Sequence, residues 1–200
     1  MTTPFVYPPV PHVRRHGPMG FADYASYRPW LRDEFSFRCV YCLIREQWGR
    51  VRGIYDIDHF LPAVNHAGLA LDYDNLLYAC TTCNTAKGSR EVPDPLLVLT
   101  SPNVQVGEDG VMHATTPEAA RLIELLGLNG KLAIEFRMLW IGIIALAMKG
   151  GPDLYRRLMG FPHDLPELDQ LKPPGGNSRP EGIATSFFAQ QERGELAESY

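Results

Sequence analysis

The sequence has no apolar stretch long enough to cross a membrane. Its most apolar run without a charged residue covers 11 residues, 138–148, and none of its charge-free runs exceeds 13 residues, whereas a membrane-spanning helix needs about 20. The N-terminal segment MTTPFVYPPVPHVRR also lacks the apolar region of a signal peptide. We therefore expect a cytoplasmic protein with no membrane partner, in which residues 138–148 form a buried helix.

The sequence also lacks an overall excess of positive charge. Its formal net charge is −4, which at first disfavours a nucleic-acid partner, because lysine and arginine dominate phosphate binding. The charge is unevenly distributed, however. Residues 1–57 contain 8 basic and 5 acidic side chains, and residues 58–200 contain 11 basic and 18 acidic ones. The first quarter of the chain is thus the basic part, and a nucleic-acid partner is not excluded.

The basic part begins with a proline-rich segment. Five prolines lie within residues 1–20, which favours an extended arm over a helix. His12, Arg14, Arg15 and His16 form a basic group on this arm. Two interpretations remain open: a solvated terminus, or an arm that contacts phosphate.

Cysteine is scarce but concentrated. The only four cysteines form two C-x-x-C pairs, Cys39 with Cys42 and Cys80 with Cys83, with 37 residues between the pairs. In a reducing compartment such pairs are typical of a metal site. A Zn²⁺ ion on four thiolates would have no open position and would serve a structural role. Two disulfides, or redox-active or unpaired cysteines, are the alternatives.

Hydrophobic periodicity and turn signals predict the remaining elements. They are a helix over 26–35, a strand over 51–57 that leads to Asp58 and His59, a strand over 75–79, a helix over 81–87, a hairpin of 103–106 with 111–114, a helix starting at Thr116, a helix over 131–149, a short helix from 152 and a flexible connection over 171–182. The helix over 131–149 is apolar on nearly every face, so either the rest of the chain or a second copy must cover it.

Polar residues between and after the cysteine pairs could carry catalysis. Phosphodiester hydrolysis with a metal needs oxygen ligands for a hard cation, a base for water and positive charge near the phosphate. Asp58 and Asn84 can offer oxygens to Mg²⁺ or Mn²⁺, and His59 can accept the proton of water. Lys87 or Arg90 can face the phosphate. His66 lies in the loop after Pro62, and we expect no direct role for it.

The order of these residues resembles that of the zinc-containing HNH endonucleases, whose ββα-metal core nicks or cuts DNA. The resemblance covers about 50 of the 200 residues and is carried by Cys39-Val-Tyr-Cys42, Asp58-His59-Phe-Leu-Pro62, Asn75-Leu76 and Cys80-Thr-Thr-Cys83-Asn84-Thr-Ala-Lys87.

The resemblance implies a role for each matching residue. His59 corresponds to the general base, and Asp58 to the metal-binding acid beside it. Asn75 corresponds to the central asparagine, which holds the loop between the strands and so orients the base. Asn84 occupies the last position, which is often histidine in the family; asparagine still offers an oxygen to the metal.

Together these observations predict an α+β protein with a zinc-stapled ββα-metal core, an N-terminal arm and a C-terminal helical extension. The expected parts are an arm (1–25), a nuclease core (26–92), a helical extension (93–170) and a flexible connection with tail (171–200). The expected function is metal-dependent endonuclease activity, on DNA rather than RNA. The alternative is a non-catalytic zinc module that binds nucleic acid or a partner protein. A homodimer or a partner protein could use the helix over 131–149.

Overall fold

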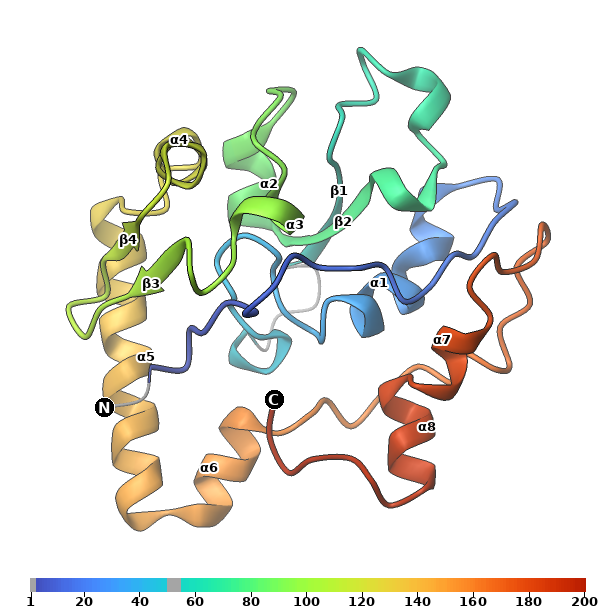
Figure 1. The fold of residues 1–200 in the computed structure, drawn as a ribbon. Helices are drawn as coiled ribbons and strands as arrows, with labels where there is room; N and C mark the ends of the chain where they lie inside the picture. Colours follow the sequence, from blue (N-terminus) through green and yellow to red (C-terminus); the bar gives the residue numbers. More distant parts are fainter. Residues whose placement is uncertain (1–2, 50–54) are drawn as a thin grey trace.

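The computed structural model describes residues 3–49 and 55–200. In Figure 1, a two-stranded sheet with a short helix lies near the centre, and the longest helix lies at one edge of the molecule. The helices and strands, in chain order, are α1 (Arg28–Glu34), β1 (Tyr55–His59), β2 (Leu76–Cys80), α2 (Thr81–Lys87), α3 (Pro95–Val98), β3 (Val104–Val106), β4 (Met112–Ala114), α4 (Pro117–Leu125), α5 (Lys131–Gly150), α6 (Pro152–Met159), α7 (Glu181–Ala184) and α8 (Phe187–Glu192).

Strands β1 and β2 and helix α2 form a ββα unit, as the sequence predicts. The strands are antiparallel, with Tyr55 opposite Cys80 and His59 opposite Leu76. Helix α2 has the predicted bounds and ends before Gly88, whose φ of 56° is readily adopted by glycine. Strand β1 continues through His59, and the part of the predicted strand over residues 51–54 lies outside the described residues. This unit carries Asp58 and His59 on β1, and Asn84 and Lys87 on α2.

The predicted apolar face of the first helix is part of the core. Helix α1 follows a short 3₁₀ turn, Tyr24–Tyr27, and contacts β2. Tyr27, Trp30 and Leu31 are all at most 1% exposed. This packing explains the aromatic spacing of residues 26–35 and fixes α1 beside the sheet.

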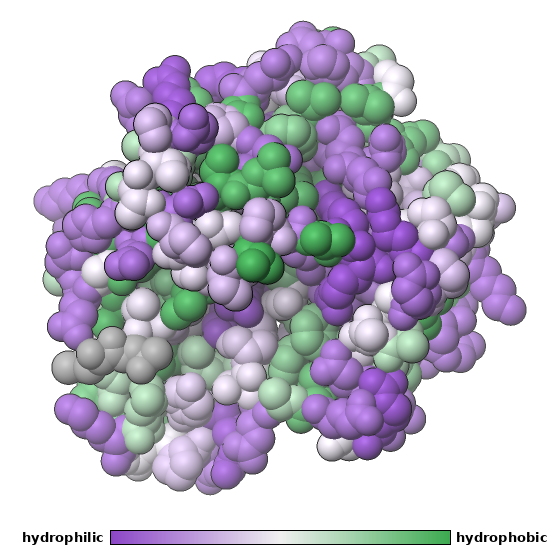
Figure 2. Space-filling view, viewed as in Figure 1, coloured by the Kyte–Doolittle hydropathy of each residue, from purple (hydrophilic) through white to green (hydrophobic). Residues whose placement is uncertain are grey.

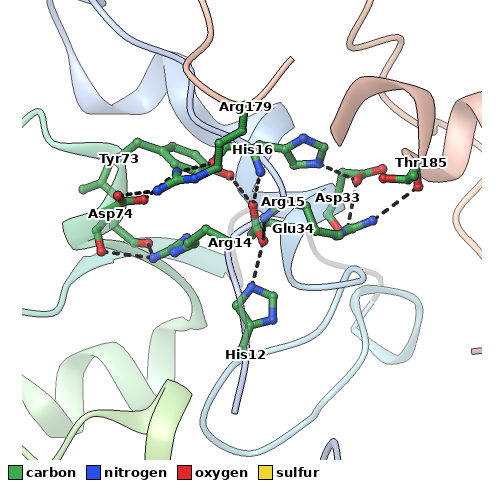
Figure 3. Close-up of polar contacts among 11 residues, drawn as sticks. His12, Arg14, Arg15, His16, Asp33, Glu34, Tyr73, Asp74, Arg179 and Thr185 are labelled. Carbon is green, nitrogen blue, oxygen red and sulfur yellow. Dashed lines mark hydrogen bonds and ion pairs between the residues drawn. The ribbon is translucent and has the colours of Figure 1, made fainter. Parts of the chain in front are cut away.

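The basic group of the N-terminal arm is bound to two acidic residues at the end of α1 (Figure 3). His12 Nε2 lies 2.7 Å from Glu34 Oε1, His16 Nε2 lies 2.8 Å from Asp33 Oδ1, and Arg15 Nη2 lies 3.0 Å from the same Asp33 oxygen. Both carboxylate side chains are fully buried, so each needs hydrogen-bonding or charged partners. Neither a solvated nor a phosphate-contacting arm describes this arrangement. The arm is a structural strap.

The segment over 171–182, which the sequence predicts to be a flexible connection, packs against the same arm. Asn177 Oδ1 accepts a hydrogen bond from the Gly17 amide at 3.0 Å, and Pro18 forms a β-bridge with Asn177. Arg179 donates two hydrogen bonds to the Asp74 carboxylate, at 2.9 and 2.7 Å. The proline and glycine content of this segment therefore shapes a docked turn.

The second half of the chain contains the predicted hairpin and helices. The expectation that residues 138–148 form a buried helix is wrong, because only one side of α5 packs: Leu139 and Leu146 are 61% and 73% exposed. Strands β3 and β4 are antiparallel, and Thr116 caps α4. Arg137 of α5 is buried and donates hydrogen bonds to the carbonyl oxygens of Gly110 (2.6 Å) and Leu128 (2.7 Å). Trp140 of α5 stacks on Trp48, with ring centroids 4.3 Å apart. The tryptophan pair joins the helical extension to the segment that follows the first cysteine pair, whereas the Arg137 bonds lie within the extension.

The face of the molecule shown in Figure 2 carries hydrophobic residues in small groups among hydrophilic ones. Among the described residues, none of the helices combines the length and the hydropathy needed to cross a membrane.

Candidate functional site

The four cysteines converge on one point beneath the ββα unit. Cys39 and Cys42 lie in the loop after α1, Cys80 ends β2, and Cys83 lies in the first turn of α2. All four are buried, and their sulfur atoms lie within 4.8 Å of one another. The Cys42 and Cys80 sulfurs are 3.7 Å apart, close to the roughly 3.8 Å edge of a tetrahedron with Zn–S bonds of about 2.3 Å. The donors and their spacing fit a structural zinc ion, and no disulfide forms among them.

The thiols of this cluster affect one another's protonation. Hydrogen bonds from Cys39 and Cys42 lower the pKa of Cys80, whereas hydrogen bonding with Cys39 raises the pKa of Cys42 and of Cys83. Several thiolates cannot share this small buried volume unless a cation compensates their charge. A zinc ion on the four sulfurs would supply that charge and would tie the loop after α1 to the start of α2.

His59 is the last residue of β1 and is half-buried. Its Nε2 lies 3.0 Å from the carbonyl oxygen of Ala70. A carbonyl oxygen only accepts hydrogen bonds, so Nε2 carries the proton and Nδ1 retains the lone pair. The ring of Tyr24 contacts the imidazole edge-on, with centroids 5.1 Å apart. The ring is thus held in one tautomer with a basic nitrogen available.

Asn75 holds the loop that leads away from His59. Its Oδ1 accepts from the Leu61 amide at 2.8 Å, and its Nδ2 donates to the carbonyl oxygens of Leu61 (3.0 Å) and Leu69 (3.2 Å). The Asn75 carbonyl also accepts from the Phe60 amide at 2.8 Å. The side chain is buried. These contacts fix the backbone on both sides of the loop and hence the direction in which His59 points.

Asp58 faces the opposite side of β1 from His59 and is only 3% exposed. Its Oδ1 lies 2.9 Å from Lys87 Nζ, and its Oδ2 accepts from the Tyr41 hydroxyl at 2.6 Å. Burial raises the pKa of Asp58, and Lys87 opposes that rise. Lys87 is 1% exposed and also donates to the His59 carbonyl at 2.6 Å. The structure therefore corrects one expectation: Lys87 is an internal partner of Asp58 and does not face a phosphate.

Asn84 contacts a carboxylate that sequence reasoning missed. Its Nδ2 donates to Asp56 Oδ2 at 3.2 Å, so the structure pairs Asn84 with Asp56 and pairs Asp58 with Lys87. Asp56 and Asp58 lie two residues apart on one face of β1, and Asn84 and Lys87 lie three apart on α2. The D-x-D alternation in YDIDH was the available signal, because a strand presents alternate residues to the same neighbour.

Comparison with known families supports the assignment of this segment. The model of the HNH endonuclease family matches residues 39–90. Residues 39–90 are an HNH domain. The match begins at the first zinc-site cysteine and ends just beyond α2. No curated protein matches the chain.

Two further residues of the HNH domain have local partners. Arg90 is exposed and donates to the carbonyl oxygens of Lys87 (3.2 Å) and Ala86 at the end of α2, where a cation is favourable. His66 lies 3.0 Å from a carboxylate oxygen of Glu91 at the surface. The sequence spacing gave no hint of this acidic partner, which lies 25 residues further along the chain.

Proposed function

We propose that this protein is a metal-dependent HNH endonuclease that hydrolyses phosphodiester bonds, most naturally in DNA. The observation that supports it best is the state of His59, which has Nε2 bound to the Ala70 carbonyl and Nδ1 left as a base. A histidine in a fixed tautomer at the edge of a rigid unit is suited to general-base catalysis. Because His59 also lies within the HNH match over residues 39–90, we take the reaction to be phosphodiester hydrolysis.

In this reaction His59 accepts at Nδ1 a proton from the water that attacks phosphorus. The Ala70 carbonyl keeps the proton on Nε2 and stabilises the imidazolium that forms. Asn75 acts through the loop backbone as a positioning residue, since its side chain bonds on both sides of that loop. A base must lie within hydrogen-bond reach of the water, so small displacements of this loop reduce the rate.

The divalent cation, Mg²⁺ or Mn²⁺, would be held by oxygens of β1 and α2. Mg²⁺ commonly uses one or two carboxylates and completes its shell with water and substrate phosphate, so Asp58 and Asn84 fit as donors. The contacts add Asp56 to this set: Asp58 is already neutralised by Lys87, whereas Asp56 meets the neutral amide of Asn84. When bound, the cation stabilises charge on the phosphate and on the departing 3′ oxygen.

We further propose a cytoplasmic location, a residue that contacts the phosphate backbone, and bounds for the nuclease core. The thiolate cluster suits a reducing cytoplasm, and Arg90 at the exposed end of α2 is the basic residue of the HNH domain assigned to the phosphate backbone. The nuclease core spans residues 26–92. The helical extension over 93–170 contributes to assembly or substrate choice.

A supercoiled-plasmid assay tests the activity. The zinc-loaded protein should relax or linearise the plasmid with Mg²⁺ or Mn²⁺ and not with EDTA. His59→Ala should lower the cleavage rate by about 100-fold or more while retaining its zinc and its fold. His66→Ala is the matched control, because that histidine lies at the surface against Glu91, and it should cleave at the wild-type rate.

The alternative, a non-catalytic zinc module, predicts a different pattern. If the chain is such a module, it should bind DNA or a partner protein but should not cleave DNA with Mg²⁺, Mn²⁺ or Ni²⁺. Cleavage by His59→Ala at the wild-type rate would also contradict the proposed mechanism, because the assigned base would then be dispensable.

A further inference from the structure

Helix α5 packs through one side and leaves the other bare. The side chains of Arg137, Ile141, Ile144 and Ala147 are buried. On the opposite face lie three leucines with large exposed fractions, which are Leu132 (80%), Leu139 (61%) and Leu146 (73%). In Figure 1 the helix stands at the edge of the molecule. Large apolar side chains that gather on one exposed surface can mark an interaction site, and these three leucines share one face of α5.

The spacing of the bare face is that of a helix-pairing seam. Its members recur at alternating intervals of three and four residues, the pattern by which two helices interlock side chains. They are Leu132, Glu135, Leu139, Gly142, Leu146 and Lys149. At Gly142 a side chain would meet no atom within 4 Å, so the middle of the seam is open and a second backbone can approach closely there.

The charges on the seam select a partner and an orientation. If a second copy of α5 runs antiparallel with Gly142 facing Gly142, Glu135 faces the partner subunit's Lys149. Leu139 then lies within one residue, about 1.5 Å along the helix, of the level of the partner subunit's Leu146. Symmetry repeats both contacts. A parallel pair in register would instead place Glu135 against glutamate and Lys149 against lysine. Within one chain, among the residues that the structure describes, Glu135 forms a surface ion pair with Lys131 at 3.9 Å. Such an exposed pair is too weak to prevent Glu135 from pairing with a lysine of a second chain.

We propose that two copies of this chain associate through α5, antiparallel, with the two-fold axis passing beside Gly142. A surface that complements itself under a two-fold rotation is what a symmetric dimer requires. On the exposed face of α5, a two-fold rotation about Gly142 brings leucines close to leucines and glutamate to lysine. The proposal concerns α5 alone and does not depend on the nuclease activity.

The first test measures the mass of the full, zinc-loaded chain by sedimentation over a range of concentrations. The wild type should change from monomer to dimer as concentration rises. Leu146→Glu should remove the dimer, because it places a charge in the seam. Leu97→Glu is the matched control: Leu97 is 57% exposed on α3, away from the seam, and the variant should dimerise as the wild type does. Circular dichroism and zinc content confirm that each variant is folded.

Charge exchange tests the orientation. Glu135→Lys alone, or Lys149→Glu alone, should weaken the dimer by about tenfold, since two symmetric ion pairs become like-charge contacts. The double variant Glu135→Lys with Lys149→Glu should recover wild-type affinity. In a parallel dimer the single variants would change nothing.

Disulfide trapping gives a second, geometric readout. Gly142→Cys should cross-link two chains under mild oxidation, because the axis brings the two sites together. Leu132→Cys should not, because ten residues on each side of the axis separate its two copies by about 30 Å along the helices, far beyond the roughly 7 Å that a disulfide spans between Cα atoms. A monomer at every concentration, a dimer that survives Leu146→Glu, or cross-linking of Leu132→Cys as readily as Gly142→Cys would each overturn the proposal.

Discussion

Removing the ammonium group of Lys87 should destabilise the protein in a pH-dependent way. Lys87→Met keeps most of the side-chain volume but leaves Asp58 buried without its cation, and Lys87 Nζ currently lies 2.9 Å from Asp58 Oδ1. Breaking a buried pair by removing one partner costs about 3–5 kcal/mol of folding free energy. We expect the loss to lie in this range at neutral pH, because both side chains are at most 3% exposed.

The pH dependence follows from Asp58. Burial already raises its pKa above the ordinary 3.8, and Lys87 is the strongest opposing influence, so its removal raises the pKa further. A carboxyl group with a raised pKa in the folded state binds a proton more tightly there than in the unfolded chain. The variant should therefore be least destabilised at low pH and lose stability as pH rises, by at most about 1.4 kcal/mol per pH unit.

Urea unfolding of the zinc-loaded protein, followed from about pH 5 to about pH 8, measures this effect. Adding Asp58→Asn to Lys87→Met should restore about 2 kcal/mol, because the unpaired charge disappears. Lys172→Met, at an exposed position, is the control and should change stability by less than about 0.5 kcal/mol. Strictly additive effects of the two substitutions, or a pH-independent loss, would refute the reasoning.

Three further predictions concern the arm and the metals. Burial would raise the pKa of Glu34, but hydrogen bonds from His12 and a backbone amide outweigh it and lower the pKa to about 2. The free energy of unfolding should therefore fall by about 3 kcal/mol as pH drops from 4.5 to about 2. In thermal unfolding, Glu34→Gln should flatten the dependence of stability on pH over this range. Zinc analysis should find one ion per chain, and Cys83→Ser or a chelator should abolish cooperative unfolding of the ββα unit. Electron paramagnetic resonance of Mn²⁺ should show weaker binding by Asp56→Asn than by the wild type, and equal binding would remove Asp56 from the proposed ligands beside Asp58.

The zinc cluster and the ββα unit could be predicted from sequence because their signals are local. Each C-x-x-C pair brings two ligands together within one turn, and Gly88 marks the end of α2 at the expected residue. The burial of Lys87 could not be predicted in this way, since lysine is almost always exposed. Only the packing of α2 on β1 shows that this lysine has an aspartate beneath it.

The basic arm shows a second limit of sequence reasoning. His12 and its partner Glu34 are 22 residues apart, and nothing in either local pattern connects them. The sequence left two interpretations of the arm open, a solvated terminus or a segment that contacts phosphate. The fold buries both acids and uses the arm's positive charge to compensate them.

The strap formed by the arm also bears on how the chain could be divided into fragments. A piece reduced to residues 39–90 would keep all four zinc ligands and His59 but lose α1 and the arm, whose contacts hold Tyr73 and Asp74 near β2. The segment that matches the HNH model therefore depends on contacts with residues that lie outside it. We expect fragment complementation: a separately added peptide of residues 1–20 should restore the fold of a chain that lacks them. If the chain is the proposed endonuclease, cleavage would then depend on supplying the peptide.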